Sequence, residues 1–260
     1  MPNSSLPLVS LHGVSKVFGS GTQALDGLDL DVGRGEFLSL LGPSGCGKST
    51  ALRILAGLSE PSRGTVTWAD GAPAGLVRGI GFVFQEPTLM PWATVFDNVF
   101  LPLKLAGEHR SGVQPRVMAA LARVGIVDFA QAYPRELSGG MKMRVSIARA
   151  LVTEPRVLLM DEPFAALDEI TRFKLNDDLI ALWRELGMTV VFVTHSVFES
   201  VYLSQRIVVM TSRPGRVSSA LMIDAPNRDA QFRTSADYAA QCRRTSEALS
   251  RATSVHRDAA

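Results

Sequence analysis

One short segment of the chain reads Gly42-Pro43-Ser44-Gly45-Cys46-Gly47-Lys48-Ser49-Thr50 and matches the pattern G-x-x-x-x-G-K-[ST]. An apolar run, Phe37 to Leu41, precedes it, and a segment with helical spacing, Ala51 to Gly57, follows it. A strand, a glycine-rich turn and a helix in this order are the context in which the pattern binds the phosphates of a nucleotide. The alternative is a Gly/Ser turn that matches by accident, and both flanking segments argue against it.

Each residue type in this segment has a physical task. Glycine permits backbone angles and a close approach that a Cβ atom would block, so a row of N–H groups can wrap a phosphate chain. The helix that begins at Lys48 points its positive end at the same anion. Lys48 adds a full charge near the β- and γ-phosphates, and the Ser49 hydroxyl is suited to bind Mg²⁺. The predicted nucleotide-binding residues are Gly42, Pro43, Ser44, Gly45, Cys46, Gly47, Lys48, Ser49 and Thr50.

Composition narrows the class of protein. The chain has 260 residues, 46% of them hydrophobic and 20% charged, which is typical of a globular protein with a substantial core. A formal charge of +2 is too small to indicate a nucleic-acid partner. Two cysteines, Cys46 and Cys242, give no disulfide framework, and a cross-link at Cys46 would obstruct the predicted site, which favours a reducing compartment.

Membrane and targeting segments are not expected. Residues 1–5 lack the basic start and the apolar run of a signal peptide, and no stretch approaches 18 consecutive apolar residues. Any role at a membrane must therefore be exercised through a partner.

The pattern along the chain predicts an α/β fold. Nearly all-apolar runs such as 157–160 and 189–193 indicate parallel strands buried on both faces. Helical patterns dominate between 86 and 154, which indicates a helical insertion, and the tail from 221 to 260 is predicted to be helical, without an assigned function. Strands are expected at 9–17, 28–32, 37–41, 65–68, 80–84, 157–160, 189–193 and 207–210, and helices from 48, around 95–102, at 113–124, from 138 and at 171–186.

Two acids, Asp161 and Glu162, follow the apolar strand 157–160. In a parallel sheet with a phosphate-binding turn, the carboxyl ends of the strands face the nucleotide. Asp161 is expected to hold Mg²⁺, directly or through water. Glu162 can accept a proton from the attacking water or orient it. An exposed acidic turn is the alternative.

Three further residues lie at strand ends. His195 follows the strand 189–193 and is a candidate donor to the γ-phosphate, although a lone histidine there is more often structural. The Gln85 amide, past the strand 80–84, could reach Mg²⁺ or the water. Phe18 could stack on the base, although a lone aromatic residue usually belongs to the core.

Taken together, these motifs resemble the ATP-binding subunit of ABC transporters over roughly residues 8 to 220. The segments that carry the resemblance are 42–50, Gln85, Leu137-Ser138-Gly139-Gly140-Met141, 157–163, Ala166-Leu167-Asp168 and His195. The resemblance implies a P-loop NTPase (RecA-like) core with a small antiparallel β subdomain and an inserted helical subdomain. It departs from many members at Met141, where they carry Gln, and at Phe18, where the stacking residue is often Tyr.

The resemblance also implies cofactors and partners. ATP and Mg²⁺ would be bound in a homodimer, in which Ser138, Gly139 and Gly140 complete the nucleotide pocket of the other subunit and Asp168 lies at the seam. Segments 87–95, 195–200 and 212–216 look like the branch that imports nitrate, sulfonates and taurine. In that branch the subunit lies on the cytoplasmic face of the plasma membrane, under permease subunits served by an external solute-binding protein, with no nucleic acid bound. Trp92 is the residue that we expect to contact the permease, with a core tryptophan as the alternative.

Two other functions deserve comparison with this one. A soluble ABC ATPase that acts on DNA or ribosomes usually carries two nucleotide domains or a long inserted coiled coil, and this chain has neither. A small-molecule kinase that shares only the phosphate-binding turn would leave 137–141, Gln85 and His195 without a role. The sequence does not determine the cargo, the permease, the coupling stoichiometry or, except by resemblance, the direction of transport.

Overall fold

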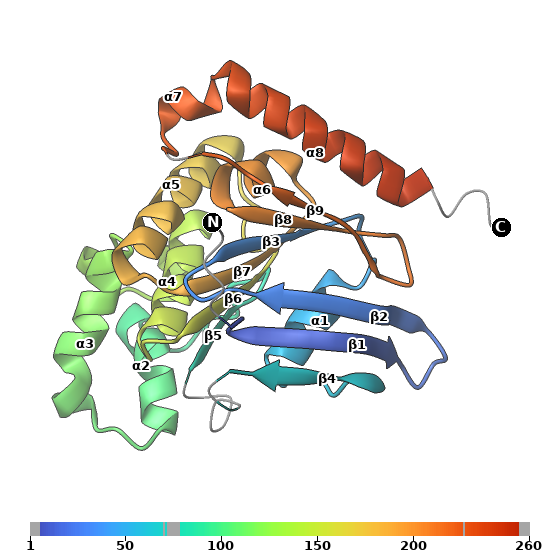
Figure 1. Cartoon of the computed structure of the whole chain (residues 1–260). Helices are drawn as coiled ribbons and strands as arrows, with labels where there is room; N and C mark the ends of the chain where they lie inside the picture. Colours follow the sequence, from blue (N-terminus) through green and yellow to red (C-terminus); the bar gives the residue numbers. More distant parts are fainter. Residues whose placement is uncertain (1–5, 70, 72–78, 226, 255–260) are drawn as a thin grey trace. The chain divides into compact units, whose positions relative to one another are not determined.

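The computed structural model describes residues 6–69, 71, 79–225 and 227–254, and it confirms the predicted α/β class (Figure 1). The chain forms two compact units. Unit 1 combines residues 1–72 with 189–260, and unit 2 comprises residues 73–188. Residues 1–5, which the sequence analysis judged unlike a signal peptide, lie outside the described residues. Within the described residues, every helix is too short or too polar to cross a membrane.

Unit 1 contains the small antiparallel sheet that the sequence analysis predicts. Its central strand β1 (Val9–Val17) pairs on one side with β2 (Gln23–Val32) and on the other with β4 (Arg63–Trp68). β2 begins five residues before the expected Leu28. The register between β1 and β2 shifts along this part, so that neighbouring residues Ala24 and Leu25 are both buried and the alternation that signals a strand is lost.

A second set of strands in unit 1 is mostly parallel. β3 (Phe37–Leu41) lies between β7 (Thr189–Thr194) and β8 (Arg206–Met210), and every residue of β3 and β7 is buried, as their apolar runs predict. β9 (Val217–Met222) pairs antiparallel with β8 and was not expected. Its residues are exposed or partly exposed, so it carries no apolar run.

The described helices of unit 1 pack against these strands or against one another. They are α1 (Lys48–Leu55), α6 (Val197–Leu203), α7 (Ala230–Arg233) and α8 (Ala236–Ser254). Cys242, Ala248 and Ala252 of α8 share a buried cluster with Val201 of α6 and with Leu41, the residue that precedes the phosphate-binding segment. The tail therefore packs against β3 and α6, which are next in sequence to the phosphate-binding segment and close to His195.

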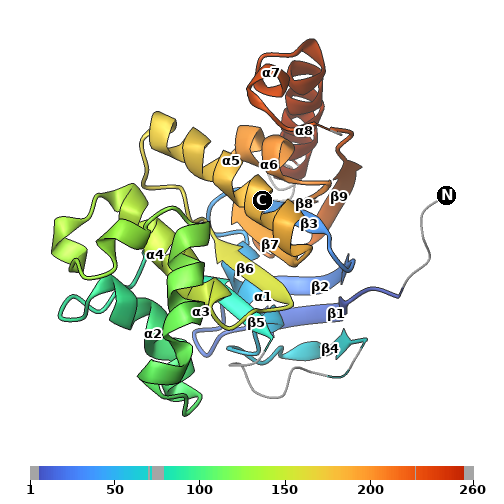
Figure 2. The ribbon, with the colours of Figure 1, turned by 90° about the vertical axis from the view of Figure 1, so that its left-hand side faces the viewer.

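Unit 2 combines two parallel strands with helices. β5 (Ile80–Val83) pairs with β6 (Val157–Asp161), and Figure 2 shows α2 (Val95–Leu105), α3 (Arg110–Arg123) and α4 (Gly139–Leu151) side by side. Two 3₁₀ turns, Val127–Phe129 and Pro134–Glu136, connect α3 to α4. α5 (Glu169–Leu186) begins two residues before the expected Thr171, because the Asp168 side chain caps it.

Tyr238 anchors α8 to α6. Its hydroxyl donates a hydrogen bond to the backbone oxygen of Phe198 at 3.0 Å. Its ring packs edge-on against Phe232, which stacks in turn on Tyr202 at the end of α6. Burial, followed in size by the neighbouring Cys242 thiol, raises the pKa of the Tyr238 phenol above its ordinary value.

Tyr238→Phe should therefore change how stability depends on pH. The folded chain keeps Tyr238 protonated where the unfolded chain ionises it, so the wild-type free energy of unfolding falls above about pH 10, by at most about 1.4 kcal/mol per pH unit from this group. The variant should be less stable at pH 8 by about 0.5–1.5 kcal/mol, because the hydrogen bond is lost, and it should lose less stability than the wild type between pH 8 and 11. Urea unfolding at both pH values measures this, and parallel losses in the two proteins would contradict it.

Candidate functional site

The phosphate-binding segment lies between the last residue of β3, Leu41, and the first residue of α1, Lys48. Gly47, which precedes the helix, has a φ of 104°, a region that favours glycine. A Cβ atom at this position would lie 2.6 Å from the backbone oxygen of Ala24 in β2. The segment thus passes so close to the backbone of a neighbouring strand that only glycine fits.

Lys48 is buried, with 3% of its surface exposed. Its Nζ atom donates hydrogen bonds to the backbone oxygens of Gly42 at 2.8 Å and Pro43 at 2.9 Å. The ammonium group is therefore held along the inner side of the segment, where it can accompany a phosphate bound to the N–H groups. Ser49 follows in the first turn of α1.

A turn after β8 supports the same segment, and sequence reasoning missed this role. Arg213 Nε donates to the backbone oxygen of Gly45 at 3.1 Å. The Gly215 N–H donates to the Ala24 oxygen at 2.9 Å, and a Cβ atom at Gly215 would lie 2.1 Å from the Cys46 oxygen. The available signal was a Pro-Gly turn after a buried strand, which the sequence analysis used only to identify a branch of a family.

His195 and Phe18 also belong to unit 1. His195 is exposed directly after β7, and Ser196 caps α6 by accepting a hydrogen bond from the Glu199 N–H at 3.3 Å. Phe18 follows β1 and is 43% exposed, with Lys16 Nζ 5.7 Å from its ring centre. Phe18 therefore does not belong to the core, and its ring can contact a ligand.

In unit 2 the paired acids lie at the end of β6. Asp161 is the last residue of the strand and is buried, and Glu162 follows it, partly buried, with a φ of 46°. A left-handed backbone at a residue other than glycine is strained, and such strain is concentrated at functional sites. The alternative of an exposed acidic turn is wrong.

Gln85 lies at the same edge as these acids. β5 and β6 run parallel with Val83 opposite Met160, so Gln85 and Glu162 each lie two residues beyond a paired position. Gln85 is exposed and outside the strand. Unit 2 thus places an amide and two carboxylates at the carboxyl ends of neighbouring strands.

The segment 138–140 and Asp168 also meet within unit 2. Ser138 Oγ accepts from the Met141 N–H at 3.3 Å and caps α4, and Asp168 Oδ1 accepts from the Thr171 N–H at 2.9 Å and caps α5. A Cβ atom at Gly140 would lie 2.6 Å from Thr171 Cγ2, so the two helix starts are in contact. The hydrogen bonds from Thr171, the backbone one first, lower the pKa of Asp168.

The predicted metal ligands carry the kind of donor atoms that a hard divalent cation prefers. Within the described residues, His, Cys, Asp and Glu side chains form no group of three that could hold a metal ion by themselves. The predicted Mg²⁺ ligands are instead oxygen atoms of Ser49, Gln85 and the buried carboxylate Asp161. Mg²⁺ prefers this small set of oxygen donors, completed by phosphates and water.

Comparison with known proteins agrees with this chemistry. The family model described as "ABC transporter" matches residues 25–165, more than half of the chain. The aliphatic sulfonates import ATP-binding protein SsuB 1 of Xanthomonas axonopodis is 46% identical over 86% of this chain and 89% of its own length. The taurine import ATP-binding protein TauB of Rhizobium johnstonii is 45% identical over 82% of each chain.

Similar solved structures are also proteins of ABC transporters. The cbiO1 protein of Clostridium perfringens, part of the ABC transporter complex cbiONQ, has a TM-score of 0.75 and 31% identity, covering 83% of this chain and 88% of its own. A dimeric ATP-binding cassette in a post-hydrolysis state with ADP and phosphate has a TM-score of 0.73 and 35% identity, covering 84% and 99%. The chain belongs to the ABC transporter family.

Proposed function

We propose that the chain binds and hydrolyses ATP with Mg²⁺ and thereby energises a membrane importer of small solutes. The observation that carries this proposal is the phosphate-binding segment, with Gly47 against the β2 backbone and Lys48 held along its inner side. Relatives named as sulfonate and taurine import proteins support import, and nitrate or another small organic solute stays within the proposed class.

The site residues divide the chemistry among them. The N–H groups of 42–50 and Lys48 bind the phosphates, Phe18 stacks on the base, and His195 donates to the γ-phosphate. Glu162 accepts a proton from the attacking water, with Gln85 orienting that water. Ser49, Gln85 and Asp161 would hold Mg²⁺, which would neutralise part of the charge on the phosphates.

A homodimer completes each site in this proposal. Ser138, Gly139 and Gly140 form a helix N-terminus, which attracts anions, and Asp168 caps the helix in contact with it. Each ATP would lie between the 42–50 segment of one subunit and the 138–140 segment of the other. The dimeric relative solved with ADP and phosphate supports this arrangement.

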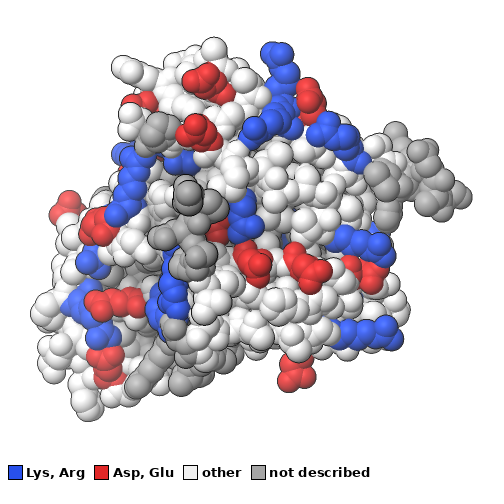
Figure 3. Space-filling view, in the orientation of Figure 1, with Lys and Arg blue, Asp and Glu red and all other residues white. Residues whose placement is uncertain are grey.

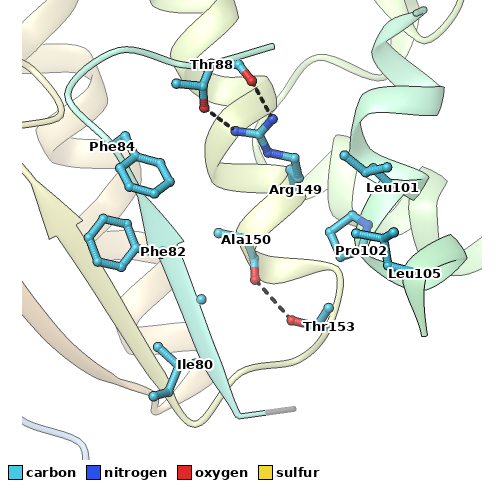
Figure 4. A pocket seen from close by; sticks show the side chains of 11 residues that line it. Ile80, Phe82, Phe84, Thr88, Leu101, Pro102, Leu105, Arg149, Ala150 and Thr153 are labelled. Atoms are coloured by element: carbon cyan, nitrogen blue, oxygen red, sulfur yellow. Dashed lines mark hydrogen bonds between the residues drawn. The ribbon is translucent and has the colours of Figure 1, made fainter. Parts of the chain in front are cut away.

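A hollow in unit 2 is the proposed docking site for the permease. Its volume is about 360 Å³, and it lies between β5, α2 and α4 (Figure 4). Apolar side chains line much of it, among them Phe82, Leu101 and Leu105, and Leu105 is 73% exposed. Trp92 is 76% exposed, so the alternative of a core tryptophan is wrong. An apolar helix of the permease would be suited to the hollow. Docking there would place the subunit on the cytoplasmic face of the membrane. An external solute-binding protein would deliver the cargo.

The two alternative functions, an ATPase that acts on DNA or ribosomes and a small-molecule kinase, have less support. Figure 3 shows acidic and basic side chains intermingled on the face that it draws, without one large basic area of the kind that attracts nucleic acid. A kinase would need an acceptor site and leaves Ser138–Gly140 without a role. Stimulation of ATP hydrolysis by DNA or ribosomes would favour the first alternative over transport.

The Glu162→Gln variant should bind ATP but hydrolyse it at least about 100-fold more slowly, because the amide cannot accept the proton from water. Phosphate release and binding of a fluorescent ATP analogue measure the two effects. Glu185→Gln is the control, since Glu185 lies exposed at the end of α5 and forms an ion pair with Arg123. Undiminished turnover in Glu162→Gln would contradict the role of Glu162.

Gly47→Ala should weaken ATP binding at least about tenfold, because the added methyl group meets the Ala24 backbone and shifts the segment. Gly45→Ala is the matched comparison. Its φ is also positive, at 74°, but its Cβ would meet only the end of the Arg213 side chain, at 3.2 Å. Titration with a fluorescent ATP analogue should show the smaller loss for Gly45→Ala. Equal losses would argue against the backbone contact as the cause.

Leu105→Asp should uncouple the subunit from its permease, because the new charge is not compensated in an apolar contact. ATP hydrolysis by the isolated chain should stay within about twofold, whereas co-purification with the permease from solubilised membranes should fall at least about tenfold. Leu58→Asp is the control, because Leu58 is 50% exposed in unit 1. Normal recovery of the permease with Leu105→Asp would exclude the hollow as its docking site.

A further inference from the structure

Arg149, near the end of α4, holds the segment that follows Gln85. Its Nη1 atom donates to the Thr88 backbone oxygen at 2.9 Å. Its Nη2 atom donates to the Pro87 backbone oxygen at 2.8 Å and to Thr88 Oγ1 at 3.0 Å. Figure 4 shows the guanidinium group turned toward Thr88, at the rim of the hollow that it helps to line. One side chain thus fixes two consecutive residues through three hydrogen bonds.

The segment held in this way is strained. Thr88 has a φ of 47°, which is unfavourable for a β-branched residue, and its side chain is exposed, so core packing does not impose this conformation. Such a backbone is unfavourable by itself and persists only where its surroundings determine it. The Arg149 hydrogen bonds are the contacts that supply this restraint.

A second polar anchor holds the far end of the same segment. The buried Asn98 accepts from the Met90 N–H at 2.7 Å and donates to the Met90, Ala93 and Thr94 oxygens. Between the two anchors, no described residue from 84 to 94 lies in a helix or strand. Gln85 lies only two residues before Pro87, so Arg149 is the anchor that governs its position, while Asn98 governs the loop around Trp92.

We propose that Arg149 is a positioning residue for Gln85. This inference rests on the proposed role of Gln85 in ATP hydrolysis. Because Arg149 belongs to α4, which begins at the 138–140 segment, a movement of that helix is transmitted to the Gln85 segment. Because Arg149 also lines the hollow, an occupant of the hollow acts on the same group. Arg149 touches neither nucleotide nor metal in this proposal and acts through Gln85.

Arg149→Lys is the informative substitution. Lysine keeps the charge and the aliphatic stem but lacks the planar fork, so it cannot reach the Pro87 and Thr88 oxygens together. We expect kcat for ATP hydrolysis to fall about tenfold, since small displacements of a positioned group have effects of this size. The dissociation constant of an ATP analogue should stay within about twofold, because the 42–50 segment is untouched.

A double-mutant cycle separates positioning from a general structural effect. Gln85→Ala alone should lower kcat, and adding Arg149→Lys to it should lower kcat no further, because the group that Arg149 positions is gone. Independent losses that multiply in the double variant would overturn the proposal. Unchanged kcat in Arg149→Lys or in Gln85→Ala would overturn it as well.

Two further variants guard against a misfolded protein. Thr88→Pro breaks the contact from the other side, since proline cannot adopt a φ near 47° and position 88 is exposed, so it should reproduce the loss of kcat in a stable protein. Arg144→Lys is the control on the same helix: Arg144 pairs with Asp178 and donates to the Val124 oxygen. It should lower Tm without lowering kcat, and a loss of kcat equal to that of Arg149→Lys would overturn the proposal.

The outcomes for the two proposals are distinct. If the wild-type chain does not hydrolyse ATP, the proposed function itself fails. If Glu162→Gln abolishes hydrolysis and Gln85→Ala lowers kcat while Arg149→Lys keeps normal kcat, the proposed function stands and only the role of Arg149 is refuted.

Discussion

The phosphate-binding segment depends on backbone contacts that only glycine permits. A Cβ atom at Gly47 would lie 2.6 Å from the Ala24 oxygen, and one at Gly215 would lie 2.1 Å from the Cys46 oxygen. Through these contacts, the backbones of β2, of the segment after β3 and of the turn after β8 pack directly against one another. Backbone atoms yield far less than side chains, so the N–H groups that we propose to bind the phosphates are fixed before the nucleotide arrives. Preorganisation of this kind reduces the entropy that binding must overcome.

Several other predicted site residues follow from a second constraint, the burial of parallel strands. A strand buried on both faces can place charged side chains within reach of solvent only where it ends, and the carboxyl ends of parallel neighbours lie at one edge. In unit 1, β3 ends at the phosphate-binding segment and β7 ends before His195. In unit 2, β5 ends before Gln85 and β6 ends at Asp161. The apolar runs therefore determine where the chemistry is placed, although the runs themselves perform none of it.

This is why much of the fold and many candidate residues could be predicted from the sequence. Patterns of neighbouring residues reveal these features. Examples are an apolar run followed by Asp-Glu, and glycines at fixed spacing before Lys48. The contacts of Arg149 and Arg213 could not be predicted, because they join residues 61 to 62 and 168 positions apart through single arginines with no local pattern. β9 was missed for a related reason, since a half-exposed edge strand lacks the apolar run that marks its neighbours.

Two of the three non-glycine residues with a positive φ in the described part of unit 2 follow the strands that lead to the predicted chemistry, whereas the third, Glu154, precedes β6. Thr88 and Glu162 have φ values of 47° and 46°, and they follow the paired strands β5 and β6. The two positions are restrained differently. Glu162 directly follows the buried β6, whereas Thr88 is exposed and is held by the guanidinium of Arg149. A conformation held by three hydrogen bonds from one side chain can be released by moving that side chain, which one held by a packed strand cannot. The Gln85 segment is therefore the part of this edge that another element can adjust, and α4 is the element that reaches it.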